Sequence, residues 1–243
     1  VKDFLNLVKK DISSEVSYSD DLWKEKIYKI KDEGIEDKPN KNNSLVKPLE
    51  VMNALSNHIR ERKTVVVTGV GCHQHWAARH LPFKPESNLF LSSGGHGTMG
   101  YDLPSAIGAA MTLKDFRIFC VVGDGSLLMN IQELASLAER NLDVKVILIN
   151  NQRLGIVSQF QLITWGKDPS TGKFRTPDFV SIAEGFSIKA KKIIISSDLE
   201  DGVNWINSFN GPALLEVMID NEADIVPMLM GGKMMNEMWM GRT

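Results

Sequence analysis

The chain has 243 residues and a formal net charge of −2, with 28 basic and 30 acidic side chains. This balance excludes the basic surface of a nucleic-acid-binding protein, and no stretch reaches the roughly 18 to 20 consecutive apolar residues of a membrane-spanning helix. The length predicts one large domain, and the presence of only two cysteines, Cys72 and Cys120, is typical of proteins of the reducing cytoplasm.

A polar segment precedes the part of the chain with regular patterning. Residues 19–44 are dense in Lys, Asp, Glu and Asn, which predicts a short helix over 22–30 followed by a polar linker. We therefore assign residues 1–46 to an N-terminal helix and linker, 47–220 to the main domain and 221–243 to a C-terminal tail.

Helical and strand-like patterns alternate along the main domain. Helices are expected over residues 48–62, near 75, and over 103–112, 130–140, 178–186 and 199–209. Short apolar runs predict strands over residues 64–68, 88–91, 117–122, 144–149, 188–195 and 213–218. Glycines and a proline predict a long loop over residues 161–175. The alternation predicts an α/β fold, a doubly wound parallel sheet with helices on both faces.

Polar motifs follow the third and fourth of these strands. Asp124, within Gly123-Asp124-Gly125-Ser126, ends the third strand, and Asn151 follows the fourth, 27 positions later. Because right-handed crossovers place the carboxyl ends of parallel strands along one edge, we expect Asp124 and Asn151 to converge. A carboxylate, a carboxamide oxygen and a main-chain carbonyl suit Mg²⁺, and the amides of Gly125 and Ser126 suit an anion. The motifs therefore predict a site for a magnesium-bound diphosphate.

These motifs resemble those of the thiamine diphosphate enzymes, in which Gly-Asp-Gly is followed at a distance by Asn-Asn. The stretch from Gly123 to Val157, GDGSLLMNIQELASLAERNLDVKVILINNQRLGIV, is similar to acetolactate (acetohydroxyacid) synthase large subunits. Three further stretches resemble the same group in the same order: TGVGCHQHWAARHL from Thr68, FLSSGGHGTMGYDLPSAIGAA from Phe90 and GPALLEVMID from Gly211. The resemblance covers roughly residues 46–230 and implies the diphosphate-binding (PP) domain of such an enzyme.

The resemblance implies a role for each motif residue. Asp124 and Asn151 would bind Mg²⁺ through their side chains, and Arg153 through its carbonyl oxygen. Met99 would hold the cofactor bent between its two rings. The cofactor-binding residues implied by the same motifs are Cys72, His73, Gly97, Met99, Gly123, Gly125, Ser126, Asn151, Gly155, Ile156 and Val157. The substrate channel is expected to contain His96, Gln159 and Phe160.

The implied cofactors are thiamine diphosphate and Mg²⁺, and the implied reaction is decarboxylation and carboligation of 2-keto acids such as pyruvate. In the family the activating glutamate belongs to a separate pyrimidine-binding domain, so we expect no catalytic residue in this chain. The chain opens with valine, and we favour a C-terminal piece of a longer enzyme over a separate cofactor-binding subunit of a heteromeric decarboxylase. In both cases we expect a homodimer or tetramer, with the chain inactive without the pyrimidine-binding domain.

Two other interpretations of these motifs are possible. Residues 95–100 also fit the G-x-G-x-x-G pattern of a nicotinamide-dependent oxidoreductase, with Asp124 as the acid that binds the ribose. That hypothesis leaves Asn151 and the segment around His73 without a role. Asp124 could also be a plain N-cap of the following helix, which its pairing with Asn151 makes the weaker hypothesis.

Three positions depart from the acetolactate synthase pattern. Cys72 stands where glutamine is typical, His96 replaces an apolar residue and Phe160 replaces a tryptophan. These positions are expected around the substrate, whereas the metal and diphosphate positions keep the pattern. The sequence therefore predicts the cofactor class and leaves the product open.

Overall fold

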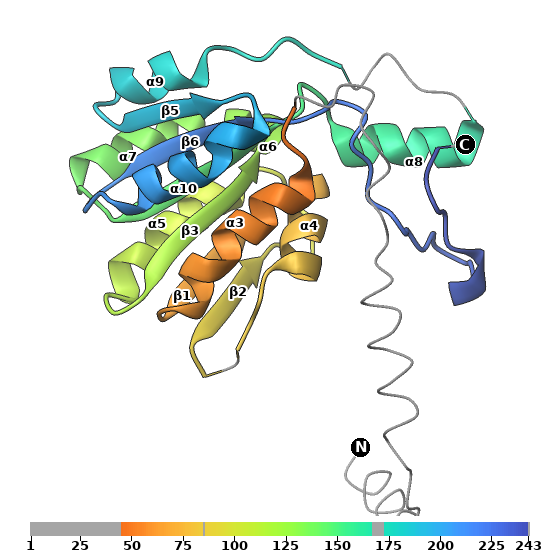
Figure 1. Cartoon of the computed structure of the whole chain (residues 1–243), viewed down its shortest axis with the longest axis horizontal. Coiled ribbons are helices and arrows are strands. Elements are labelled where there is room, and N and C mark those ends of the chain that lie inside the picture. The colour runs from red at the N-terminus through yellow and green to blue at the C-terminus, as the bar shows by residue number, and fades with distance from the viewer. Residues whose placement is uncertain (1–44, 85, 167–172, 243) are drawn as a thin grey trace, which may run out of the picture. The chain divides into compact units, whose positions relative to one another are not determined.

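The computed structural model describes residues 45–84, 86–166 and 173–242 (Figure 1). The helix predicted over residues 22–30 and the linker after it lie outside the described residues. Six strands form one parallel sheet in the order β2-β1-β3-β4-β6-β5, as the alternation of patterns predicted. Helices cover both of its faces, so the doubly wound fold is confirmed.

The elements are labelled as in Figure 1. The strands are β1 (Thr64–Thr68), β2 (Asn88–Ser92), β3 (Arg117–Gly123), β4 (Val144–Asn150), β5 (Lys189–Ile193) and β6 (Ala213–Met218). The helices are α3 (Pro48–Arg60), α4 (Cys72–His80), α5 (Asp102–Thr112), α6 (Asp124–Met129), α7 (Leu134–Glu139), α8 (Gly155–Trp165), α9 (Phe179–Gly185) and α10 (Leu199–Asn207). Short 3₁₀ helices cover Ile131–Glu133, Ser196–Asp198 and Met235–Glu237.

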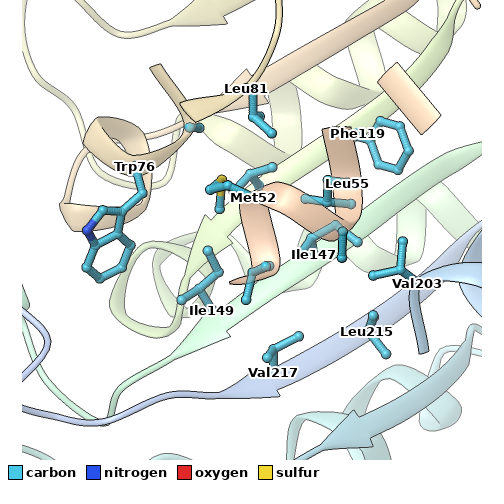
Figure 2. Packing of buried hydrophobic residues seen from close by; sticks show 14 of the residues in the cluster. Met52, Leu55, Trp76, Leu81, Phe119, Ile147, Ile149, Val203, Leu215 and Val217 are labelled. Carbon is cyan, nitrogen blue, oxygen red and sulfur yellow. The ribbon is translucent and has the colours of Figure 1, made fainter. Parts of the chain in front are cut away.

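The strand residues alternate between two apolar cores, one on each face of the sheet. On β3, Phe119 and Val121 point to the face covered by α3, α4 and α10, whereas Cys120 and Val122 point to the face covered by α5, α7 and α9. Figure 2 shows the first core, where Met52 and Leu55 of α3 lie beside strand residues. Because successive side chains of a strand point to opposite faces, strands buried on both faces read as continuous apolar runs.

The direction of winding reverses between β1 and β3, which are neighbours in the sheet. The helix after β1 packs on one face of the sheet, through Cys72, Trp76 and Ala77, whereas the helix after β3 packs on the other face through Leu127. In open α/β sheets such a reversal leaves a crevice at the carboxyl ends of the strands, where ligands bind. The fold therefore places its ligand site beside the ends of β1 and β3.

One predicted segment is only partly α-helical and another was wrong, and the other predicted elements begin and end within two residues of expectation. The helix expected over residues 130–140 consists of a 3₁₀ turn over Ile131–Glu133 followed by α7, and a separate helix, α6, precedes it and ends at Asn130. The side-chain amide of Asn130 bonds to the carbonyl of Gly100, a contact that a local pattern cannot reveal. The loop expected from residue 161 is helical as far as Trp165, because Gly166 in the left-handed conformation ends α8 only there.

Within the described residues, no helix combines the length and the apolar character that crossing a lipid bilayer requires. The longest, α3, has 13 residues, fewer than the roughly 20 needed for a span.

Replacement of the buried Ile147 should test the packing of the central strand. Ile147 lies on β4 with no exposed surface, so Ile147→Ala should lower the free energy of unfolding by about 2 to 5 kcal/mol. Urea unfolding followed by circular dichroism measures this change. The control Ile195→Ala removes a side chain that is 41% exposed and should cost less than about 1 kcal/mol. Equal losses in the two variants would contradict the described core.

Candidate functional site

A cavity lies where the loops after β1, β3 and β4 meet. The space between its walls has a volume of about 420 Å³, part of which is open to solvent. Its wall contains the segment 70–73 after β1, the segment 123–126 after β3 and the segment 153–157 after β4. Met99 and Asn151 also line it. The cavity therefore coincides with the place where the sheet reverses its winding, as expected for a ligand site in this fold.

Asp124 is the first residue of α6, and its side chain is buried at the cavity wall. Its Oδ1 accepts a hydrogen bond of 2.7 Å from the Gly125 amide, and Oδ2 is buried with no hydrogen-bond partner among the described residues. Loss of solvent raises the pKa of Asp124 to about 6, while the main-chain amides of Gly125 and of residues 151–153 pull the pKa down. The carboxylate thus lies against the loop that carries Asn151, as predicted from the adjacent strand ends.

Two asparagine side chains shape the loop after β4. Asn150 accepts a hydrogen bond of 3.0 Å from the amide of Gln152, and Asn151 accepts one of 3.2 Å from the amide of Arg153. Gln152 has a φ of 53°, in the left-handed region that such a turn requires. The Asn150 amide nitrogen in turn donates to Glu216 Oε1 on β6 at 2.7 Å. The buried Glu216 therefore supports the loop from the sheet below it.

The donor atoms at this site are of mixed types. In the described part of the chain, no three His, Cys, Asp or Glu side chains gather where they could hold a metal ion. Asp124, the Asn151 carboxamide and the Arg153 backbone line one cavity and together offer oxygen donors. One carboxylate with neutral oxygens suits Mg²⁺, which takes its remaining ligands from water and phosphate.

Glycines keep the cavity open. A Cβ on Gly123 would come within 2.8 Å of His73 Nδ1, and one on Gly125 within 2.6 Å of Leu154 Cδ2 and 3.2 Å of Met99 Cε. A Cβ on Gly155 would lie 2.8 Å from Cys72 Sγ and 2.9 Å from Asn151 Nδ2. A residue with a Cβ at any of these positions would force its neighbours to shift, so glycine permits the close approach of the segments around the cavity.

His73 is buried on the first turn of α4, with its Nε2 atom 3.9 Å from Asp102 Oδ2. This nitrogen has no hydrogen-bond partner among the described residues. Burial, and to a smaller extent the nearby His75, lowers the pKa of His73 to about 3. His73 is therefore neutral at physiological pH, so toward an anion it could offer a hydrogen bond but no positive charge.

Most of the cofactor-binding residues predicted from the motifs lie together at the cavity wall. These are Cys72, His73, Met99, Gly123, Gly125, Ser126, Asn151, Gly155, Ile156 and Val157, with the metal candidates Asp124 and Arg153. Gly97 lies apart, in an exposed turn after β2. Their contacts with a cofactor stay predictions, because the arrangement shows proximity alone.

The three residues predicted for the substrate channel do not line the cavity. His96 is exposed in the turn after β2, and the Phe160 side chain is 42% exposed on α8. Gln159 is fully buried, where its carboxamide donates to the Ile225 carbonyl at 2.7 Å and accepts from the Ile225 amide at 2.8 Å. In this arrangement Gln159 holds the C-terminal segment against α8, and a channel role for the three residues stays a prediction.

Residues that the sequence did not single out also shape the site. Asp102, the first residue of α5, is fully buried and accepts a hydrogen bond of 2.6 Å from the Ser126 hydroxyl. Leu154 and Phe174 also lie close to Gly125, within 2.6 Å and 3.8 Å of a Cβ placed there. Asp102 stands within a motif quoted above, but an acid at the start of a helix is also the ordinary pattern of an N-terminal cap. No signal in the sequence separates these cases.

Comparison with protein families identifies the family of the chain. Residues 69–217 match the C-terminal TPP-binding domain of the thiamine pyrophosphate enzymes. The chain belongs to this family. The matched region contains every element of the cavity, and the family match removes the basis for the nicotinamide alternative, whose G-x-G-x-x-G segment lies after the edge strand β2.

Relatives within the thiamine pyrophosphate enzymes carry acetolactate synthase names. The chain is 40% identical to the large subunit of acetolactate synthase isozyme 1 of Escherichia coli over 175 residues, which are 72% of this chain and 31% of the relative. It is 35% identical to an acetolactate synthase large subunit of Cyanidium caldarium over 240 residues, 98% of this chain and 40% of the relative. A mitochondrial acetolactate synthase catalytic subunit of Aspergillus candidus is 37% identical over 190 residues, 77% of this chain. The chain thus spans between 27% and 40% of the length of these relatives.

The buried, neutral His73 should make the fold sensitive to acid. Below pH 6.5 a histidine in the unfolded chain is protonated, whereas folded His73 stays neutral down to about pH 3. The free energy of unfolding should therefore decrease as the pH falls through this range. The expected contribution is about 1.4 kcal/mol per pH unit. Urea unfolding at pH 7 and 4.5 should show a smaller drop for His73→Gln than for the wild type. The control His58→Gln, on α3, should keep the wild-type drop; equal drops in all three proteins would contradict a buried neutral His73.

A methyl group at position 155 should disturb Asn151. Gly155→Ala should displace the Asn151 carboxamide and weaken the binding of pyrophosphate in the presence of Mg²⁺ by about tenfold, as measured by titration calorimetry. Gly94→Ala is the matched control, since nothing lies within 4 Å of a Cβ there. Adding Cys72→Ala should restore part of the affinity by freeing the space of the thiol. Wild-type affinity in Gly155→Ala would show that the close contact has no influence on binding.

Proposed function

We propose that this chain supplies the diphosphate- and Mg²⁺-binding half of a thiamine diphosphate enzyme that decarboxylates and joins 2-keto acids, in the manner of acetolactate synthase. The observation that carries the proposal is the meeting of Asp124 and the Asn151 loop in one glycine-lined cavity at the carboxyl ends of β3 and β4. The acetolactate synthase names of the relatives support the substrate class, with pyruvate as the expected donor.

The charges of the site favour a cation between protein and diphosphate. Asp124 is buried, and burial alone disfavours its ionised form. A diphosphate beside it would add like charge, so the two groups are compatible when a divalent cation lies between them. Asp124 Oδ2, which is buried and has no hydrogen-bond partner in the described part of the chain, can accept such an ion. The residues present therefore fit a magnesium-bound diphosphate.

The remaining side chains of the cavity are suited to orient an organic cofactor and exclude water. Met99 Cε and Leu154 Cδ2 both lie against Gly125, and Ile156 and Val157 form the adjoining wall on the first turn of α8. This apolar wall next to the diphosphate position would face the rings of the cofactor. When bound, thiamine diphosphate supplies the carbanion stabilisation that decarboxylation of a 2-keto acid requires. The chain's own residues position it and keep the surroundings dry.

A second domain is needed to complete the chemistry. Among the residues lining the cavity, Asp124 is the only carboxylate, and it is committed to the metal in this proposal. The activating glutamate would thus come from a pyrimidine-binding domain, either of the same gene product or of a partner subunit. Large exposed apolar side chains on α6, α8 and the C-terminal segment support such a partner: Met129, Val157, Phe160, Trp165, Leu229, Met234 and Met240. We accordingly propose a homodimer or tetramer as the assembled form.

The free, buried state of Cys72 and Cys120 supports a reducing compartment such as the cytoplasm. Relatives from Aspergillus candidus and Zea mays carry mitochondrial and chloroplastic names, so the compartment differs among members of the family.

Removal of the Asp124 carboxylate tests the proposed site. Asp124→Ala should lower the affinity for thiamine diphosphate in the presence of Mg²⁺ by at least about a hundredfold, because a direct ligand is lost. Titration calorimetry with and without Mg²⁺ measures this change. Asp201→Ala removes an exposed acid on α10 and should bind as the wild type does. Unaltered Mg²⁺-dependent affinity in Asp124→Ala would count decisively against the assignment.

An activity assay separates the two halves of the proposed enzyme. The chain alone should consume no pyruvate at a measurable rate, whereas addition of a pyrimidine-binding domain from a relative should allow turnover in the presence of both cofactors. Turnover by the isolated chain would contradict the division of the active site.

A further inference from the structure

Asp102 joins separate segments of the cavity wall. Its carboxylate is fully buried at the start of α5. It accepts a hydrogen bond of 2.6 Å from the Ser126 hydroxyl on α6 and one of 3.1 Å from the amide of Leu103. The amide of Gly69, in the loop after β1, also lies near the carboxylate and lowers its pKa. A Cβ on Gly69 would overlap with the Asp102 carboxylate, so this loop approaches the acid as closely as glycine allows. One side chain thus fixes the loop after β1 to the helix after β3.

Ser126 extends this connection to a third segment. The Ser126 hydroxyl oxygen accepts a hydrogen bond of 2.9 Å from the amide of Gly100, the residue that follows Met99. The carbonyl of Gly100 accepts a bond of 2.7 Å from the side-chain amide of Asn130. Gly100 is therefore held on both of its backbone polar groups, and the position of Met99 beside Gly125 depends on these bonds. All three segments that Asp102 joins, directly or through Ser126, carry residues of the cavity wall.

We propose that Asp102 is a positioning residue of the diphosphate site, whose carboxylate sets the spacing of the segments around Gly71, Met99 and Gly125. The proposal rests on the proposed function and names a residue outside its cofactor and metal ligands. No cofactor contact by Asp102 is involved, since the carboxylate lies behind the wall and acts through Gly69 and Ser126.

The same geometry determines how Ser126 can bind an anion. An ionised Asp102 has no proton to donate, so the 2.6 Å contact places the hydroxyl proton of Ser126 on the line toward Asp102. The second contact of the hydroxyl is the Gly100 amide, which donates to it. The hydroxyl then has no proton left for a phosphate oxygen. Ser126 could then contribute to anion binding only through its main-chain amide.

The negative charge of Asp102 would affect anion binding in the opposite direction to its positioning of the loops. Burial raises the pKa of Asp102, and hydrogen bonds from Ser126, Leu103 and Gly69 oppose this rise. Two buried titratable groups interact with the carboxylate: His73 on α4, whose Nε2 lies 3.9 Å from Asp102 Oδ2, and Cys120 on β3, whose pKa the charge of Asp102 helps to raise. If Asp102 acted mainly as a negative charge, its removal would tighten anion binding. If it acts by positioning, its removal weakens binding, so the direction of the change distinguishes the two.

The experiment uses the full chain of 243 residues with inorganic pyrophosphate and Mg²⁺ as the probe. Asp102→Asn keeps the size of the side chain but replaces one acceptor oxygen by an amide NH2 group. This group only donates, so it cannot accept from the Leu103 amide or from the Ser126 hydroxyl, whichever it faces. We expect pyrophosphate to bind about tenfold more weakly to this variant in titration calorimetry. Hydrogen exchange followed by mass spectrometry or NMR should show faster exchange of the Gly69 amide than in the wild type.

Two further variants separate positioning from general stability. Ser126→Ala keeps the acid but loses the bond to Gly100, so exchange at the Gly100 amide should accelerate and pyrophosphate affinity should again fall. Asn88→Ala removes a buried amide that bonds to Lys84 and Ile59 at the start of β2, the opposite end of the sheet. Asn88→Ala should reduce thermal stability yet leave pyrophosphate affinity unchanged. If the role of Asp102 were merely structural, Asp102→Asn would behave in the same way.

The outcomes are separable. Weaker binding with faster exchange at Gly69 supports the positioning role, and if Asp102→Asn does not fold, weaker binding by folded Ser126→Ala supports it instead. Unchanged or tighter binding of pyrophosphate by folded Asp102→Asn overturns it, as does wild-type affinity in Ser126→Ala. A wild-type chain that fails to bind pyrophosphate with Mg²⁺ would refute the proposed function itself, a different result from the failure of this inference.

Discussion

The pairing of β3 with β4 is the constraint on which the site depends. The two strands run parallel in register, with Gly123 opposite Ile149, so the residues that follow them emerge side by side. A shift of this register by one residue would reverse the faces of an entire strand and expose apolar side chains of both cores, so burial itself holds the strand ends in place. The position of Asp124 relative to the Asn151 loop is therefore secured by the core rather than by contacts within the site.

The cavity contains buried carboxyl groups whose ionised forms burial disfavours, and a bound cation would stabilise the ionised form. Two buried carboxyl groups, Asp124 and Asp102, lie in or behind a wall that is proposed to bind an anion, and burial raises the pKa of both. Asp102 is compensated by hydrogen-bond donors, whereas Oδ2 of Asp124 has no such partner in the described residues. A fold optimised only for stability would avoid this arrangement, which is a common feature of binding sites.

The sequence predicted the features that depend on local pattern. Buried parallel strands read as apolar runs, and the polar residues after them mark the edge where ligands bind, so Asp124 and Asn151 could be placed together without coordinates. The end of α6 at Asn130 and the length of α8 could not be predicted from local pattern. The first depends on a bond to the distant carbonyl of Gly100, and the second on which glycine adopts the left-handed conformation. Asp102 was missed for a related reason: its partners Gly69 and Ser126 are distant in sequence.

The double hydrogen bond between Gln159 and Ile225 has a consequence for the end of the chain. Both polar ends of the Gln159 carboxamide are satisfied by one backbone position in the C-terminal segment, and Ile225 itself is fully buried. In a protein that ended before Ile225, the buried carboxamide of Gln159 would lose these hydrogen bonds. Each unpaired polar group would destabilise the fold by about 1 to 3 kcal/mol. Ile225 thus belongs to the same folding unit as α8, and the smallest autonomous form of this domain extends beyond its final strand, β6.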